Sequence, residues 1–82
     1  MNIPPQLKGW HVALHHSKNR EHGIHVETIE QWMDRNIDAI QRRVHSEWFV
    51  VGFAPTNLAA CELVESFSRA LEKEEKRAAE SN

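Results

Sequence analysis

The sequence has no tyrosine, a single cysteine and no apolar run long enough to cross a bilayer, which takes about 20 residues. One cysteine cannot form an intrachain disulfide, so we expect a cytoplasmic protein in which Cys61 is a small buried residue. The first residues lack the basic and apolar stretches of a secretion signal. We therefore predict no membrane partner.

Glycine is also scarce, and the three glycines are too widely separated to form a phosphate-binding loop. The sequence lacks the His-apolar-His pattern that puts two histidines on one strand face. His25 and Glu27 lie two residues apart but have no nucleophile beside them in the sequence. We therefore predict no catalytic residues, no cofactor and a protein that is not an enzyme.

Charge of one sign is not in excess, because the formal net charge is -2 over 82 residues. This balance indicates neither a broad basic surface for nucleic acid nor the strong negative charge of a nucleic-acid mimic. Nucleic acid is therefore not our first expectation for a partner. It remains an alternative through Lys18 and Arg20, which lie at the tip of a predicted hairpin.

Histidine is abundant by contrast, and five of the six histidines lie within fifteen residues: His11, His15, His16, His22 and His25. Metal binding needs ligands that converge on one ion, whereas His11 and His15 would stand roughly 13 Å apart along a strand. Only pairs remain, such as His15 with His25, or His16 with His22 near Glu21. We predict no metal site and keep histidine-based metal binding as a second alternative.

Residues 10–16 and 22–27 alternate between polar and apolar side chains, which predicts two strands of a β-hairpin. A symmetric loop would place Leu14 opposite Ile24 and Val12 opposite Val26. One face of the hairpin would then be apolar. The reverse face would carry His11, Ala13, His15, His25 and Glu27.

Thr28 and Gln31 have the spacing of a capping box, so a helix should begin there. Its apolar stripe would comprise Ile29, Trp32, Met33, Ile37, Ile40 and Val44.

Residues 48–54 are apolar on both faces and predict an inner or doubly covered strand that ends at Pro55. Thr56 or Asn57 would cap a second helix, with Ala60, Val64, Phe67 and Leu71 facing inward.

These elements predict an α+β protein, a small two-layer α/β sandwich of order β-β-α-β-α. Its three-stranded mixed sheet would have both helices on one face, and the first strand could lie in the centre or at an edge. We expect a single domain over residues 1–82. Residues 1–9 would form an extended lead-in, and residues 73–82 a charged helix end that frays.

A sheet with both helices on one face leaves its other face bare. If Phe49, Val51 and Phe53 faced the helices, Trp48, Val50 and Ala54 would lie on that bare face. The predicted partner-binding residues are Trp48, Val50, His11, Ala13, His15, His25 and Glu27, an apolar centre with a polar edge. As the alternative, Trp48 curls over a strand edge or is covered by the Pro4–Pro5 segment.

These expectations favour a non-catalytic protein-binding or regulatory module, an adaptor or an inhibitor that occupies a partner protein's surface. Small proteins of phages and mobile elements include such modules. Homodimerisation through the sheet is one mode of binding that the size of the chain favours. Because histidine changes charge between about pH 5 and 8, we expect the contact to depend on pH.

Overall fold

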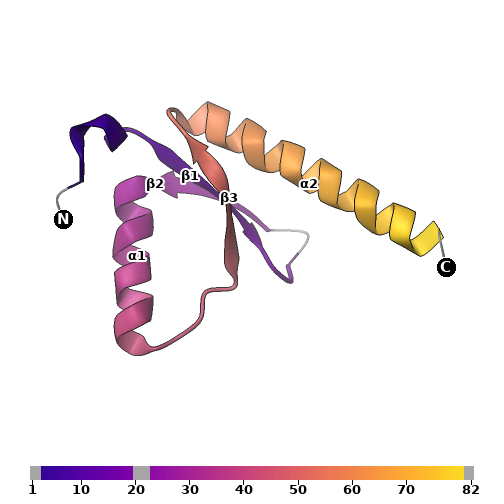
Figure 1. The fold of residues 1–82 in the computed structure, drawn as a ribbon, viewed down its shortest axis with the longest axis horizontal. Coiled ribbons are helices and arrows are strands. Elements are labelled where there is room, and N and C mark those ends of the chain that lie inside the picture. Colours follow the sequence, from indigo (N-terminus) through magenta and orange to yellow (C-terminus); the bar gives the residue numbers. More distant parts are fainter. Residues whose placement is uncertain (1–2, 20–22, 81–82) are drawn as a thin grey trace.

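The computed structural model describes residues 3–19 and 23–80, and it confirms the predicted order of strands and helices (Figure 1). The elements are the 3-10 helix η1 (Pro5–Leu7), β1 (His11–His16), β2 (Ile24–Thr28), α1 (Ile29–Arg42), β3 (Trp48–Ala54) and α2 (Asn57–Glu80). The short helix η1 interrupts the lead-in that was predicted to be extended. No helix among the described residues is long and apolar enough to span a membrane.

The three strands form one sheet in the order β2-β1-β3, so β1 is the central strand. β1 is antiparallel to both of its neighbours, and the sheet is therefore antiparallel throughout, where a mixed sheet was predicted. β2 and β3 run in the same direction but are not adjacent. α1 connects them by crossing over β1, which leaves β3 as one of two free edges.

The register of the hairpin differs by one residue from the predicted one. Val12 lies opposite Glu27 and Leu14 opposite His25, because the loop between the strands spans residues 17–22. Since side chains alternate along a strand, a shift of one residue moves every β2 side chain to the other face. The predicted pairing of Leu14 with Ile24 was therefore wrong.

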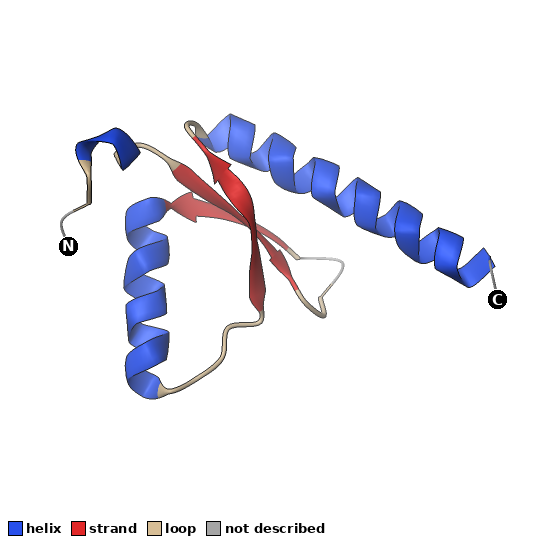
Figure 2. Cartoon of the chain, viewed as in Figure 1, coloured by secondary structure: helices blue, strands red, loops and turns tan. Residues whose placement is uncertain are grey.

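The two helices pack on opposite faces of the sheet, as Figure 2 shows, and the prediction that both lie on one face was wrong. Val12 and Leu14 pack beneath α1, whereas Ala13 packs beneath α2. All three side chains are buried. Three consecutive apolar residues are typical of a strand that is covered on both sides, and β1 has this pattern.

The capping box predicted for α1 is confirmed. Thr28 Oγ1 accepts a hydrogen bond from the Gln31 backbone N–H, and Gln31 Oε1 accepts one from the Thr28 N–H. The helix ends at Arg43, whose φ of 57° is left-handed and whose N–H bonds to the Ala39 and Ile40 carbonyls. Only the first half of the apolar stripe is covered, because Ile37, Ile40 and Val44 are exposed.

α2 is capped by Thr56, whose Oγ1 accepts a hydrogen bond from the Ala59 N–H. It packs on the sheet through small side chains. Ala60 and Val64 of α2 form one buried cluster with Ala13 of β1 and Ala54 of β3. Phe67, predicted to face inward, is exposed, and Cys61, predicted to be buried, is half-buried. The helix continues to Glu80, and beyond Leu71 its described residues are exposed.

A β-bulge interrupts the pairing of β3 with β1. Ala13 lies opposite Gly52 and Leu14 opposite Val50, so Val51 is the extra residue. The bulge changes which side chains share a face. Trp48, Val50 and Phe53 lie on the α1 face, and Phe49, Gly52 and Ala54 lie on the α2 face. The simple alternation predicted for β3, with Phe49 and Phe53 on one face, was therefore wrong.

Candidate functional site

The seven residues predicted to form one docking surface are divided between the two faces of the sheet. His11, Ala13 and His15 lie on the face that α2 covers. Trp48, Val50, His25 and Glu27 lie on the face that α1 covers. The one-residue shift in register separates His25 and Glu27 from the other histidines, and α2 occupies the face that was expected to be bare.

The residues beneath α2 are withdrawn from solvent. Ala13 is 0% exposed and His15 is 5% exposed. The Nδ1–H of His15 donates to the His16 carbonyl at 2.9 Å, and its ring meets the Phe67 ring edge-on with centroids 5.4 Å apart. His15 is thus a packed and hydrogen-bonded core histidine, and neither Ala13 nor His15 offers an exposed surface, whereas His11 on the same face is half-buried.

Trp48 lies across the sheet on the α1 face. Its ring is 5.0 Å from the His16 ring on β1 and 5.7 Å from the His25 ring on β2, centroid to centroid. The side chain belongs to the apolar cluster around Val12 and Leu14. Trp48 therefore stabilises the fold by packing over two strands, and it does not form the exposed centre predicted for it.

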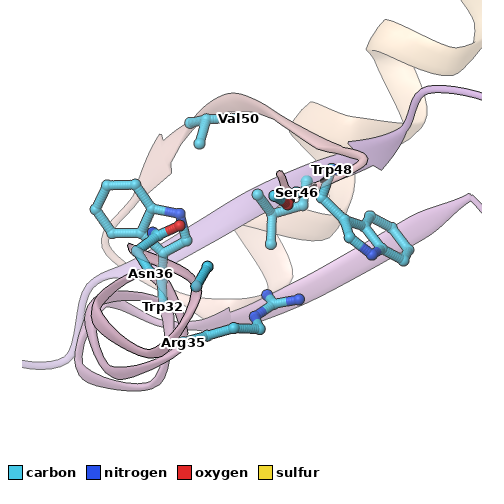
Figure 3. A pocket seen from close by; sticks show the side chains of 8 residues that line it. Trp32, Arg35, Asn36, Ser46, Trp48 and Val50 are labelled. Carbon is cyan, nitrogen blue, oxygen red and sulfur yellow. Dashed lines mark hydrogen bonds between the residues drawn. The ribbon is translucent and has the colours of Figure 1, made fainter. Parts of the chain in front are cut away.

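Glu27 is a buried carboxylate, 9% exposed, held by two partners. Arg35 of α1 makes an ion pair with Glu27 Oε1, and His25 Nε2 lies 3.2 Å from Oε2. Beside this pair, α1 and the sheet enclose a cleft of about 100 Å³. Figure 3 shows Trp32 and Trp48 at opposite ends of this cleft with Arg35 between them. Its size suits a few water molecules.

The hairpin tip is held by the ring of His16. Nδ1 accepts hydrogen bonds from the Lys18 N–H at 3.0 Å and the Asn19 N–H at 2.9 Å. Nε2 donates to Glu47 Oε2 at 3.1 Å, and Lys18 Nζ lies 3.3 Å from Glu47 Oε1. The charge of Lys18 therefore has an acidic partner, while Arg20 lies outside the described residues. This geometry adds no support for nucleic-acid binding.

Within residues 3–19 and 23–80, no group of three or more His, Cys, Asp or Glu side chains is arranged to hold a metal ion. His15 and His25 lie on opposite faces, so they cannot share an ion as a pair. Glu21 and His22, the other candidate ligands near the turn, lie outside the described residues.

An exposed apolar surface lies along the free edge of β3. We call it the β3 side. It comprises Phe49, Val50 and Phe53 from β3; Ile37 and Ile40 from α1; and Leu63 and Phe67 from α2. Phe49 is 64% exposed and Ile40 is 76% exposed.

The helical spacing of α1 directs its exposed apolar residues toward this edge. Met33 lines an apolar groove of about 400 Å³ together with Phe53 of β3. Ile37 and Ile40 follow Met33 at steps of four and three residues, so they continue the same flank of the helix, whereas Val44 lies beyond the helix end and lines a hollow with Arg35 and Glu47. On the opposite flank, Arg35 reaches Glu27 of β2. α1 thus presents its apolar flank toward β3 and its charged flank toward β2.

α2 is arranged in the same way on the other face of the sheet, with an apolar flank toward β3 and a charged flank toward β2. Leu63 lies over Gly52 of β3, because a Cβ at Gly52 would be 2.6 Å from Leu63 Cδ2. Phe67 lies one turn further along the same flank. On the other flank, Ser68, Glu72 and Glu75 line a hollow with Ile24 of β2. The apolar flanks of α1 and α2 therefore lie beside β3, one on each face of the sheet.

Most of the β3 side was missed at the sequence level. Phe49 and Phe53 were assigned to a covered face, and Ile37 and Ile40 to the core. The signal was available in the length of the α1 stripe, which continues to Ile40, beyond what a short sheet can cover. Comparison with known proteins adds nothing to this description, since no protein-family model, curated protein or solved structure matches the chain.

Proposed function

We propose that the chain is a non-catalytic protein-binding module, a regulatory adaptor or inhibitor, that docks through its β3 side. The observation that carries this proposal is that three neighbouring elements, β3 and the flanks of α1 and α2 beside it, each expose large apolar side chains. Contiguous apolar patches on soluble domains mark interaction surfaces. Phenylalanine at the centre of such a patch is typical of a protein interface.

The shape of the β3 side favours a protein over a small molecule. It is an open strand edge flanked by two helices, and the backbone of β3 offers unpaired N–H and C=O groups along that edge. A partner strand can satisfy these groups by adding to the sheet. We further propose a cytoplasmic location, because the single cysteine leaves no intrachain disulfide to form.

The proposal is tested by affinity capture from the native cell with matched baits. Phe49→Lys places a charge in the β3 side. Leu58→Lys places the same charge on α2 at a residue that is 69% exposed and lies outside this surface. We expect wild type and Leu58→Lys to retain the same protein and Phe49→Lys to lose it. Retention of one specific protein by all three baits would show that the β3 side is not the docking surface.

A further inference from the structure

We infer that the β3 side binds a second copy of this chain, so that the two sheets join at β3 into one continuous six-stranded antiparallel sheet. This inference rests on the proposed function and names its partner. Antiparallel pairing of one edge with itself requires a two-fold axis perpendicular to the sheet. Each face of one sheet then continues into the same face of the other sheet, so α1 lies beside α1 of the other copy and α2 lies beside α2.

The absence of charge along β3 favours a copy as the occupant. Trp48–Ala54 has no charged residue and no proline, although edge strands are usually protected by lysine, by proline or by a bulge. Apart from its bulge at Val51, β3 has none of these features. Across a two-fold axis residue i of one copy faces residue j of the other and j faces i, so only a residue on the axis meets its own kind, where a charge would repel its copy. The uncharged β3 avoids such repulsion in any register of the two copies.

The flanking helices distinguish a copy from an added peptide. A single foreign strand could pair with β3, but it would leave Ile37 and Ile40 of α1 and Phe67 of α2 in water. A second copy places its own β3, α1 and α2 at the same levels relative to the plane of the sheet as those of the first copy. All three apolar rows of the β3 side are then covered at once, the rows from α1, from β3 and from α2.

The α2 helices also fit this arrangement. Over residues 59–70 their flank toward β3 comprises Ala59, Leu63, Ser66, Phe67 and Ala70, which are uncharged and mostly small, and further along the helix Glu74 and Arg77 pair with each other. Two antiparallel helices with such flanks can approach closely. The charged residues Glu72 and Glu75 lie on the opposite flank, beside β2, and so stay away from the axis.

The available area is sufficient for a stable dimer. The three phenylalanines of the β3 side expose roughly 300 Å² of apolar surface between them. Its four aliphatic residues, Ile37, Ile40, Val50 and Leu63, add a comparable area. Stable interfaces bury about 800 Å² on each partner, a little over half of it apolar. The β3 side thus supplies the apolar part of a standard interface.

Sedimentation equilibrium of the purified full chain over a wide micromolar range tests the inference. We expect a closed dimer with a dissociation constant in the micromolar range or below. Phe49→Lys and Ile40→Lys should each raise that constant at least roughly tenfold, and Leu58→Lys should leave it unchanged. Circular dichroism checks the fold. Ile40 is so exposed that its substitution keeps the fold even if Phe49→Lys does not.

Three results would overturn the inference: a wild-type monomer at all concentrations, assembly that grows beyond a dimer, or a dimer that Phe49→Lys and Ile40→Lys do not weaken. The capture experiment separates these results from failure of the proposed function. A monomeric wild type that retains a foreign protein, which Phe49→Lys then loses, contradicts the second copy but leaves the module a binder. A monomer whose bound proteins do not depend on Phe49 contradicts both.

Discussion

The ring of His16 joins the hairpin turn to the residue that precedes β3. Nδ1 accepts from two backbone N–H groups of the turn, and Nε2 donates to Glu47. The two ring nitrogens therefore have fixed and different roles, with the proton on Nε2. Nothing in the composition distinguishes this histidine from its neighbour His15, because the roles follow from what each ring faces, the hairpin turn for His16 and Phe67 of α2 for His15.

His16→Ala should lower the free energy of unfolding by about 1 kcal/mol, because the two N–H groups of the turn lose their acceptor. His16→Asn should lose less, since its Oδ1 takes the place of Nδ1, whereas His16→Gln puts its acceptor further from the turn. Urea denaturation of the three variants measures these differences. Equal losses for the Asn and Ala variants would show that the Nδ1 contacts do not stabilise the turn.

The ion pair between Arg35 and Glu27 links α1 to β2. Arg35→Met should lower the free energy of unfolding by about 1–2 kcal/mol, because Glu27 stays buried with His25 as its remaining partner. Arg35 is itself half-exposed, so the loss is smaller than for a fully buried pair. Adding Glu27→Met should recover part of the stability. Strictly additive losses in this double-mutant cycle would contradict the coupling.

At the scale of the elements, helix ends are the features that the sequence predicts well. The Thr28–Gln31 capping box occurs as expected, and Thr56 caps α2 where Thr56 or Asn57 was predicted, because capping depends on side chains within one turn of each other. Strand register is not predicted as well. The loop over residues 17–22 has one residue more than symmetric pairing assumes, and that single residue moves His25 and Glu27 to the other face.

α2 packs on the sheet through alanines, so its distance from the sheet is set by small side chains. Ala60→Leu should lower the free energy of unfolding by about 2–3 kcal/mol, because Ala60 is fully buried against Ala13 and Ala54. The matched change Ala79→Leu, on an exposed part of the same helix, should cost less than about 0.5 kcal/mol. Chemical denaturation of both variants measures the difference. A tolerated leucine at residue 60 would contradict close packing of α2.

The molecule as a whole is extended for its length. Its radius of gyration is 14.7 Å, compared with about 12 Å for a compact chain of this size. One helix on each face of a three-stranded sheet buries few large side chains, and the β3 side stays uncovered. A second copy placed against β3 adds apolar burial where the single chain has least. This is the physical reason for expecting a small domain of this kind to associate.

The location of the docking surface could not be read from the sequence. The composition and the apolar third strand correctly predicted a small α+β domain. Assigning its exposed residues required knowing that α2 covers the Ala13 face and that β3 lies at an edge. Both facts depend on contacts between residues far apart in the chain, so local patterns did not determine them.

Amide hydrogen exchange of β3, measured at low and high protein concentration, tests the central claim most directly. If the β3 side is a docking edge for a second copy, the outward amides of β3 become more protected as the concentration rises, and Ile40→Lys removes that protection. The amides of β2, at the other edge, should not change. Exchange in β3 that is independent of both concentration and Ile40→Lys would contradict the account.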